Sequence, residues 1–247
     1  MDSDFLSDVE LYFSNLAAMG NKFKIEGEEK HHIIDVMRHS VGDNLYITDG
    51  KGSIFYCRIA NIDKKFVETV ILETKFYENT FSHIIFCIPR LKSAERFEFA
   101  LEKCVELGVT NFIVFESARA IAKGEKLERW QKILISAMKQ SLRSWLPKIR
   151  YAKNFNELIS MKGQKIIFDQ SAIQSFNEYL STYNNSLTTD KYLIFGPEGG
   201  LTEEELEALS AEGRGQSDIN KVKLTENRLR SETAIISAAM LLSTLHL

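Results

Sequence analysis

The stretch Ile194-Phe195-Gly196-Pro197-Glu198-Gly199-Gly200 is the most informative part of the 247-residue sequence. It leaves an apolar run, and a helix is expected to begin shortly after it, near Thr202. Glycines in such a turn permit positive φ angles and let a flat ligand approach the backbone closely. The acids Glu203–Glu205 suit the first turn of the expected helix, but they repel phosphate. The loop therefore fits an adenine or a ribose better than a pyrophosphate, although a bare turn of this composition is unremarkable by itself.

Two common kinds of nucleotide-binding site are excluded, because the sequence does not contain the glycine-rich loops that they need. A Rossmann-type site needs a glycine-rich turn after the first strand of the sheet, whereas the first strand here is followed by Pro89-Arg90-Leu91. A Walker A loop needs Gly-Lys-Ser/Thr, which does not occur in the sequence. Ser-His-Asp and Cys-His sites stay open, because sequence order does not decide them.

From about Phe81 onward, short apolar runs alternate with longer amphipathic stretches, which is typical of βα units that build a mostly parallel sheet. Helices are expected after Ser93 as far as Gly108, over Glu125–Ser141, and from Glu232 to about Leu245. The expected strands are His83–Ile88, Asn111–Phe115, Lys165–Phe168, Lys191–Phe195 and Lys221–Leu224, with a weaker one near Ile149–Ala152.

The first 77 or so residues are rich in strands instead. The expected strands are Lys22–Ile25, Asn44–Thr48, Ser53–Ile59 and Phe66–Leu72, with one helix at about Glu28–His39. Asp49-Gly50-Lys51-Gly52 supplies a hairpin turn between two of the strands. We therefore expect two domains, residues 1–77 and 78–247.

Charge is distributed unevenly along a chain whose net charge is −3. Residues 1–80 carry 9 basic residues against 14 acids, whereas Ser117–Arg150 carries 9 basic residues against only Glu125 and Glu128. Within that segment one helix face presents Arg129, Lys132, Lys139 and Arg143. Such a basic face is typical of a surface that contacts phosphates. A helix face exposed to solvent would explain the same charges about equally well.

Composition indicates a soluble, cytoplasmic protein without a metal site. Hydrophobic residues make up 44% and charged residues 26% of the chain. Cys57, Cys87 and Cys104 lack metal-ligand spacing and fit buried, reduced thiols. The N-terminus does not resemble a signal peptide, and the most apolar segment, Ala234–Leu247, is too short to cross a bilayer. Because the last helix is apolar nearly all round, its outer face calls for a partner subunit.

Four segments together resemble one family, the uridine-N3 methyltransferases of small-subunit ribosomal RNA, which are members of the SPOUT superfamily of knotted methyltransferases. The first is His31–Arg38 with Gly42-Asp43 and the Asp49–Gly52 turn, and the second is Lys92 with Glu102–Val109. The third comprises Trp130, Ala137, Gln140, Arg143 and Pro147. The fourth joins Gly196–Gly200 to Leu224–Ala234. The resemblance runs over nearly the whole chain in the right order.

The resemblance implies an N-terminal PUA-like β-barrel that binds RNA and a SPOUT-type α/β methyltransferase domain with a parallel sheet and a deep trefoil knot. It also implies a homodimer that uses S-adenosylmethionine to methylate N3 of a uridine in 16S rRNA. The expected substrate is this rRNA within the small ribosomal subunit. The implied cofactor-binding residues are Phe168, Gly196, Pro197, Glu198, Gly199, Gly200, Lys223, Leu224, Leu229 and Arg230.

The chemistry of the reaction assigns further residues within this family. Uridine N3 must lose a proton while charge spreads onto O2 and O4. We expect Arg230 to stabilise that charge or to position a phosphate, and Glu232 or Glu198 to act as base or to orient Arg230. For Glu232 a simple helix-terminus role is about equally expected. The expected RNA-binding residues are Arg38, Lys92, Arg96, Arg129, Lys132, Lys139 and Arg143.

The sequence departs from the family pattern in two places. Leu11-Tyr12-Phe13 lacks the basic residue that commonly precedes this aromatic pair. The family segment Leu-Gly-x-Arg-Ile-Leu-Arg becomes Leu224–Arg230, with Thr225 in place of the glycine. The first arginine of the segment is either replaced by Asn227 or moved by one position. Two other functions therefore stay open: a non-catalytic RNA-binding or ribosome-assembly protein on the same fold, and a ribose 2′-O methyltransferase.

Overall fold

The computed structural model describes residues 9–15, 20–182, 189–212 and 219–244. It divides into two compact units. The first contains residues 1–79 together with Ile135–Leu146, and the second contains Thr80–Leu134 and Pro147–Leu247. Helix α3 (Leu127–Gln140) therefore contributes its last residues, from Ile135, to the first unit.

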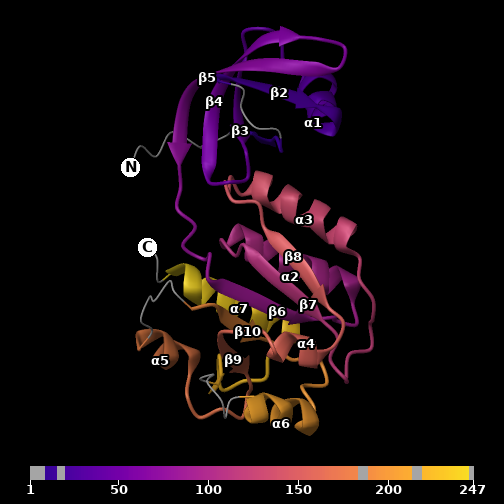
Figure 1. Cartoon of the computed structure of the whole chain (residues 1–247), viewed down its shortest axis with the longest axis vertical. Helices are drawn as coiled ribbons and strands as arrows, with labels where there is room; N and C mark the ends of the chain where they lie inside the picture. Colours follow the sequence, from indigo (N-terminus) through magenta and orange to yellow (C-terminus); the bar gives the residue numbers. More distant parts are fainter. Residues whose placement is uncertain (1–8, 16–19, 183–188, 213–218, 245–247) are drawn as a thin grey trace. The chain divides into compact units, whose positions relative to one another are not determined.

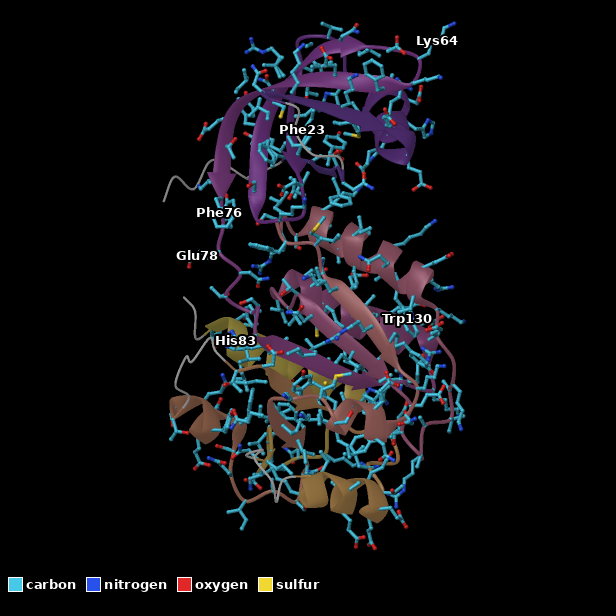
Figure 2. All side chains as sticks on the ribbon, viewed as in Figure 1. Phe23, Lys64, Phe76, Glu78, His83 and Trp130 are labelled. Carbon is cyan, nitrogen blue, oxygen red and sulfur yellow. The ribbon has the colours of Figure 1, made fainter. Side chains whose placement is uncertain are left out.

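A five-stranded sheet forms the first unit, with the strand order β1-β3-β4-β5-β2 (Figure 1). Its strands are β1 (Leu11–Phe13), β2 (Lys22–Glu26), β3 (Asn44–Thr48), β4 (Ser53–Ile62) and β5 (Phe66–Phe76). All pairs are antiparallel except β1 with β3. Alternate residues of the strands, including Phe23, Ile25 and Ile47, fill one core (Figure 2).

The helix expected at Glu28–His39 is shorter and less regular in the structure. It consists of α1 (Gly27–His31) and a π-helical turn, η1 (His32–Val36). Arg38 has a φ of +59°, which a right-handed helix does not allow, so the helix ends before it. The apolar side chain of Ile33 is fully buried in the core of the first unit.

The segment Ile135–Leu146 closes the open side of the β3–β4 hairpin. The amide of Leu146 donates to the carbonyl of Gly50 (2.9 Å), and the amide of Gly52 donates to the carbonyl of Ser144 (3.0 Å). The buried Thr48 hydroxyl also donates to Ser144 O, and the indole of Trp145 donates to the carbonyl of Tyr77. The hairpin turn expected at Asp49–Gly52 is therefore bound on its outer side by residues almost one hundred positions later.

The second unit is an α/β domain with a six-stranded parallel sheet, as expected from the sequence (Figure 1). The strand order is β11-β9-β10-β6-β7-β8. The strands are β6 (Ile84–Pro89), β7 (Asn111–Phe115), β8 (Lys148–Ala152), β9 (Gln164–Phe168), β10 (Lys191–Ile194) and β11 (Ile219–Val222). The remaining helices are α2 (Ala94–Glu106), α4 (Phe155–Ile159), α5 (Phe176–Ser181), α6 (Glu203–Glu212) and α7 (Ser231–Thr244).

Both faces of this sheet are covered, which explains why its strands are apolar throughout. Ile85 and Cys87 of β6 pack with residues of α4 and α6 on one face. The alternate residues Ile84, Phe86 and Ile88 point to the opposite face and are fully buried as well. There α2 and α7 pack against each other, and the Phe97 ring of α2 contacts the buried Trp130 ring of α3. Trp130 is labelled in Figure 2. The three cysteines are free and buried, as expected.

The last strand and the end of one helix differ from the expected bounds. The sequence predicts a strand over Lys221–Leu224, whereas β11 covers Ile219–Val222, and Lys223 and Leu224 leave the sheet for the following loop. Arg143 was expected on the basic face of α3, but that helix ends at Gln140. Leu142 has a φ of +56°, and the amide of Arg143 bonds back to the carbonyl of Met138, which is a Schellman-type helix end.

Gly52 and Gly42 make a matched pair for testing the packing of the hairpin. Both have positive φ angles, +105° and +98°, so alanine strains both backbones alike. A Cβ at Gly52 would lie 2.6 Å from Phe76 and Trp145, whereas nothing lies within 4 Å at Gly42. We expect Gly52→Ala to lower the free energy of unfolding by about 1–3 kcal/mol more than Gly42→Ala does.

Urea unfolding followed by Trp145 fluorescence in a Trp130→Phe background measures this difference, because Trp130 and Trp145 are the two tryptophans of the chain. Equal losses in the two alanine variants would show that the hairpin does not depend on close packing against Trp145.

Candidate active site

The second unit contains a pocket of about 810 Å³ at the carboxyl ends of β9, β10 and β11. Ligands of open parallel sheets bind outside the carboxyl ends of strands, where the strand order reverses. Here the order reverses between β6 and β9, and β10 fills the place between them. The lining residues are Arg96, Ile167–Gln170, Phe195–Leu201, Leu206, Val222–Thr225, Asn227–Glu232 and Ala234.

The glycine-rich loop after β10 forms one wall of this pocket. The amide of Gly200 donates to the carbonyl of Pro197 (2.9 Å), and the φ of +73° at Gly200 requires a glycine. Gly196 differs, because its φ is ordinary and a Cβ would come no closer than 3.5 Å to its neighbours Gly200 and Leu201. Nothing in the described fold demands a glycine at position 196, where an added Cβ would make ordinary contacts with the backbone of Gly200 and Leu201.

The loop between β11 and α7 forms the opposite wall. Lys223 pairs with the segment before α5, since its amide donates to Gln174 O and its carbonyl accepts from the amide of Phe176. At the other end of the loop, the hydroxyl of Ser231 donates to the carbonyl of Gly196 (3.1 Å). The two loops are therefore joined directly, and their backbones face one pocket.

Aromatic rings form the floor between these loops. Phe168 ends β9 and Phe195 directly follows β10, and their rings stack with an interplanar angle of 2° and a centroid distance of 4.5 Å. Phe176 of α5 meets Phe168 edge to face. This apolar floor excludes water beneath any flat ligand held by the loops.

Charged side chains meet at the start of α7 and beside the glycine-rich loop. Glu232 pairs with Arg96 at 3.5 Å, and its side chain is only 13% exposed. Glu198 accepts a hydrogen bond from the amide of Lys92 through Oε1 (3.0 Å). Arg230 is exposed and forms no ion pair within the described part of the chain. The expected catalytic residues Arg230, Glu232 and Glu198 thus line a single pocket, and so do all ten expected cofactor-binding residues.

The expected RNA-binding residues differ in whether they form ion pairs and in which unit they lie. Arg129 pairs with Glu98 (2.6 Å), and Lys139, within the first unit, pairs with Glu29 (2.5 Å). Lys132 is exposed and forms no ion pair with the described residues. Arg96 lines the pocket, Lys92 is exposed beside it, and Arg38 and Arg143 are exposed in the first unit.

Sequence reasoning missed several residues of the pocket. Asp169 and Gln170 line it and come directly after β9, so the rule that ligands gather at carboxyl ends of strands was the available signal. It also missed Arg119, whose guanidinium donates to the carbonyls of Gly199 (2.9 Å) and Leu201 (3.2 Å). No spacing in the sequence indicates that contact.

The loop that carries Arg119 is anchored at its base by Glu116. Glu116 Oε1 accepts from the amide of Gly124 (2.7 Å) and from the hydroxyl of Tyr151 in β8. The Gly124 amide, followed by the Tyr151 hydroxyl, holds the pKa of Glu116 below its ordinary value. Burial, followed by the hydrogen bond to Glu116, raises the pKa of Tyr151 to about 12.

Family models match both units of the chain. A model described as an RNA methyltransferase domain matches residues 78–243, and one described as an RNA methyltransferase PUA domain matches residues 25–72. The chain belongs to the RNA methyltransferase family. Its similarity to known members covers most of the chain: it is 30% identical over 233 residues to the ribosomal RNA small subunit methyltransferase E of Bacillus subtilis, covering 90% of this chain and 89% of that one.

Solved structures show the same fold as this RNA methyltransferase. One is the ribosomal RNA small subunit methyltransferase E from Neisseria gonorrhoeae bound to S-adenosyl methionine, with a TM-score of 0.80 and 26% identity over 96% of this chain and 98% of that one. Another is a probable rRNA-methyltransferase from Porphyromonas gingivalis, with a TM-score of 0.79 and 29% identity, again covering 96% and 98% of the two chains. The expected PUA-like domain and the expected α/β methyltransferase domain with a parallel sheet are thereby confirmed.

Within the described ranges of this RNA methyltransferase, no group of three or more His, Cys, Asp or Glu residues is placed to hold a metal ion. The helices of the same ranges include none that is long and apolar enough to span a membrane.

The Tyr151–Glu116 contact predicts a pH dependence of stability. The folded state raises the pKa of Tyr151 from its ordinary value of 10.0 to about 12, so it favours the neutral phenol. The stability that this preference provides is complete below pH 10 and is lost as the pH rises from 10 towards 12. We expect Tyr151→Phe to be less stable than the wild type by a constant amount below pH 10, and by a shrinking amount above it.

Chemical unfolding at a series of pH values measures the two stabilities, and the difference in absorbance at 295 nm between wild type and Tyr151→Phe follows the phenol directly. A Tyr151 that ionises near pH 10 would contradict the prediction.

Proposed function

We propose that this RNA methyltransferase transfers a methyl group from S-adenosylmethionine to N3 of a uridine in 16S rRNA, within the small ribosomal subunit. The observation that carries this proposal is the pocket, in which the glycine-rich loop and the β11–α7 loop bring Arg230, Glu232 and Glu198 together with all ten expected cofactor-binding residues. The relatives named ribosomal RNA small subunit methyltransferase E support the choice of RNA.

The residues of the pocket fit S-adenosylmethionine. The glycines of the loop let a flat group approach the backbone, and the stacked Phe168 and Phe195 rings close the floor below it. Glu203 and Glu204 in the first turn of α6 disfavour phosphate, which the cofactor lacks. The lining has carboxylates, which suit the positively charged sulfur of the cofactor, and basic side chains, which suit its carboxylate. The acids are Asp169, Glu198 and Glu232, and the basic residues are Arg96, Lys223, Arg228 and Arg230.

The bound cofactor supplies a methyl group on a positively charged sulfur, so the protein has to align the acceptor and manage the charge of the uracil ring. Arg230 is free to approach that ring, and its guanidinium stabilises negative charge on O2 or O4. Glu198 binds the Lys92 amide through Oε1, which leaves Oε2 to accept the N3 proton. Glu232 is paired with Arg96, so its role is to orient the basic groups at the mouth of the pocket.

RNA binding is proposed for the expected set of cations. Lys132 on α3, Lys92 and Arg96 beside the pocket, and Arg38 and Arg143 in the first unit are exposed. Arg96, Arg129 and Lys139 have carboxylate partners, which phosphates must replace when RNA binds. The cations that already pair with carboxylates therefore contribute less to the free energy of RNA binding than unpaired cations do.

The same proposal assigns RNA binding to residues 1–77 and methyl transfer to residues 78–247. The trefoil knot implied by the family resemblance stays a prediction. So does the homodimer. Its support is α7, where Met240 is 51% exposed on a helix whose other apolar residues are buried or half-buried. Because the proposed substrate belongs to the small ribosomal subunit, we expect the protein to act in the cytoplasm.

Nucleoside analysis of the product tests the proposal. Small subunits from a strain that lacks the gene are incubated with the purified protein and isotope-labelled S-adenosylmethionine, and the rRNA is digested for mass spectrometry. Label in 3-methyluridine is the expected result. Label in a 2′-O-methylated nucleoside would establish the ribose methyltransferase instead, and cofactor binding without any label would favour a non-catalytic assembly protein.

Gly196→Ala tests the cofactor site apart from the reaction. The added methyl fits the fold but occupies the space inside the loop, next to Gly200 and Leu201. We expect S-adenosylmethionine and S-adenosylhomocysteine to bind at least about tenfold more weakly, a change of about 1.4 kcal/mol. Isothermal titration measures the affinity, and an unchanged unfolding midpoint shows that the fold is intact. Unaltered affinity in this variant would place the adenosine elsewhere.

Arg230→Lys tests the proposed stabilisation of charge. Lysine keeps the charge but loses the planar fork of donors. We expect turnover to fall about 100-fold, as when one oxyanion-stabilising donor is removed, while cofactor affinity stays nearly unchanged. Single-turnover methylation and titration calorimetry measure the two quantities. Turnover equal to that of the wild type would remove Arg230 from the mechanism.

Lys132→Ala tests the RNA-binding surface, and Lys162→Ala is its control. Lys162 is also exposed, but it lies in the turn before β9, at the amino ends of the strands. We expect the slope of log affinity against log salt to fall by about 1 in Lys132→Ala, because one phosphate contact is lost, and to stay unchanged in Lys162→Ala. Equal slopes in both variants would refute the contact.

A further inference from the structure

The loop between β7 and α3 reaches the outer side of the glycine-rich loop at two points. At the first, Arg119 Nη1 donates to the carbonyls of Gly199 (2.9 Å) and Leu201 (3.2 Å). The hydrocarbon part of the Arg119 side chain also lies along Gly199, where a Cβ would be 3.4 Å from Arg119 Cβ. Arg119 is exposed and does not line the pocket.

At the second point, the buried carboxylate of Glu205 joins both loops. It accepts from the amide of Ala118 (2.8 Å), the hydroxyl of Ser117 (3.1 Å) and the amide of Thr202 (2.9 Å). Glu205 is only 8% exposed, so these three donors replace the water that a buried carboxylate would otherwise need.

These contacts fix two peptide planes on either side of the Gly200–Leu201 pair. In the first plane, the Gly199 carbonyl is bound by Arg119 and the Gly200 amide by Pro197 O. In the second plane, the Leu201 carbonyl is bound by Arg119 and the Thr202 amide by Glu205. Because a peptide unit is planar, holding its oxygen and its N–H at opposite ends leaves it no rotation.

We infer that Arg119 is a positioning residue for cofactor binding, which acts by fixing the backbone of the glycine-rich loop without touching the ligand. The inference rests on the proposed use of S-adenosylmethionine. Without Arg119, two carbonyls lose their common donor, and Gly199 and Gly200 gain the freedom that glycine has in an unrestrained loop. Binding then has to supply the ordering that the wild type provides in advance.

The test compares Arg119→Ala and Arg119→Lys with a control, Arg150→Ala, which removes an exposed arginine from β8 of the same unit. We expect Arg119→Ala to bind S-adenosylmethionine and S-adenosylhomocysteine about tenfold more weakly in titration calorimetry, the size of effect that one hydrogen bond to a charged donor supports. Arg119→Lys, which keeps a charged donor, should recover part of the loss, and Arg150→Ala should bind as the wild type does.

Steady-state kinetics separate positioning from a general loss of structure. A positioning role raises KM for S-adenosylmethionine while kcat and KM for RNA stay near those of the wild type, whereas partial unfolding lowers kcat as well. Glu205→Gln combined with Arg119→Ala should give less than the sum of the two single effects, because both act through the same loop.

The outcomes distinguish this inference from the proposed function. A wild type that binds neither ligand would overturn both. Binding by the wild type with unchanged affinity in Arg119→Ala, or a loss in Arg119→Ala that appears equally in kcat and in the unfolding midpoint, would overturn the positioning role alone.

Discussion

The placement of β10 between β9 and β6 is the constraint on which the site depends. β10 forms parallel ladders with both neighbours, so the carboxyl ends of the three strands lie at the same edge of the sheet. A glycine-rich loop therefore leaves the middle of the sheet, with Phe168 on the adjacent strand to form its floor. If β10 lay at an edge, the loop would have a neighbouring strand on one side only. The parallel direction and the central position of a four-residue strand thus determine where a ligand is enclosed.

The loops around this point are shaped by a few polar contacts that reach across long stretches of sequence. Ser231 connects α7 to Gly196, Lys92 connects the β6–α2 loop to Glu198, and Arg119 connects the β7–α3 loop to Gly199. Each contact binds a different part of the glycine-rich loop. The acids and bases of the pocket are held in the same way, by partners from other loops, so the site is assembled from the ends of several strands.

The sequence predicted those parts of the structure that depend on local pattern. β3 and β7 have the expected bounds, and the glycine-rich loop lies at a pocket, because alternation, apolar runs and glycines act within a few residues. Contacts between distant residues were not predictable in this way. Nothing local indicates that Lys139 pairs with Glu29, or that a leucine at position 142 adopts a positive φ and ends α3. The family resemblance supplied the site residues that local pattern alone does not assign.

The first unit includes a piece of chain that is made late, and this affects the order in which the protein matures. When residues 1–79 have emerged during synthesis, the segment Ile135–Leu146 that binds Gly50, Gly52 and Tyr77 does not yet exist. Domains made first usually fold first. Here β6, α2 and β7 are synthesised while the hairpin still lacks its partner, so the N-terminal half is completed by a segment from the middle of the chain. The first unit therefore cannot be completed until part of the second unit has been synthesised.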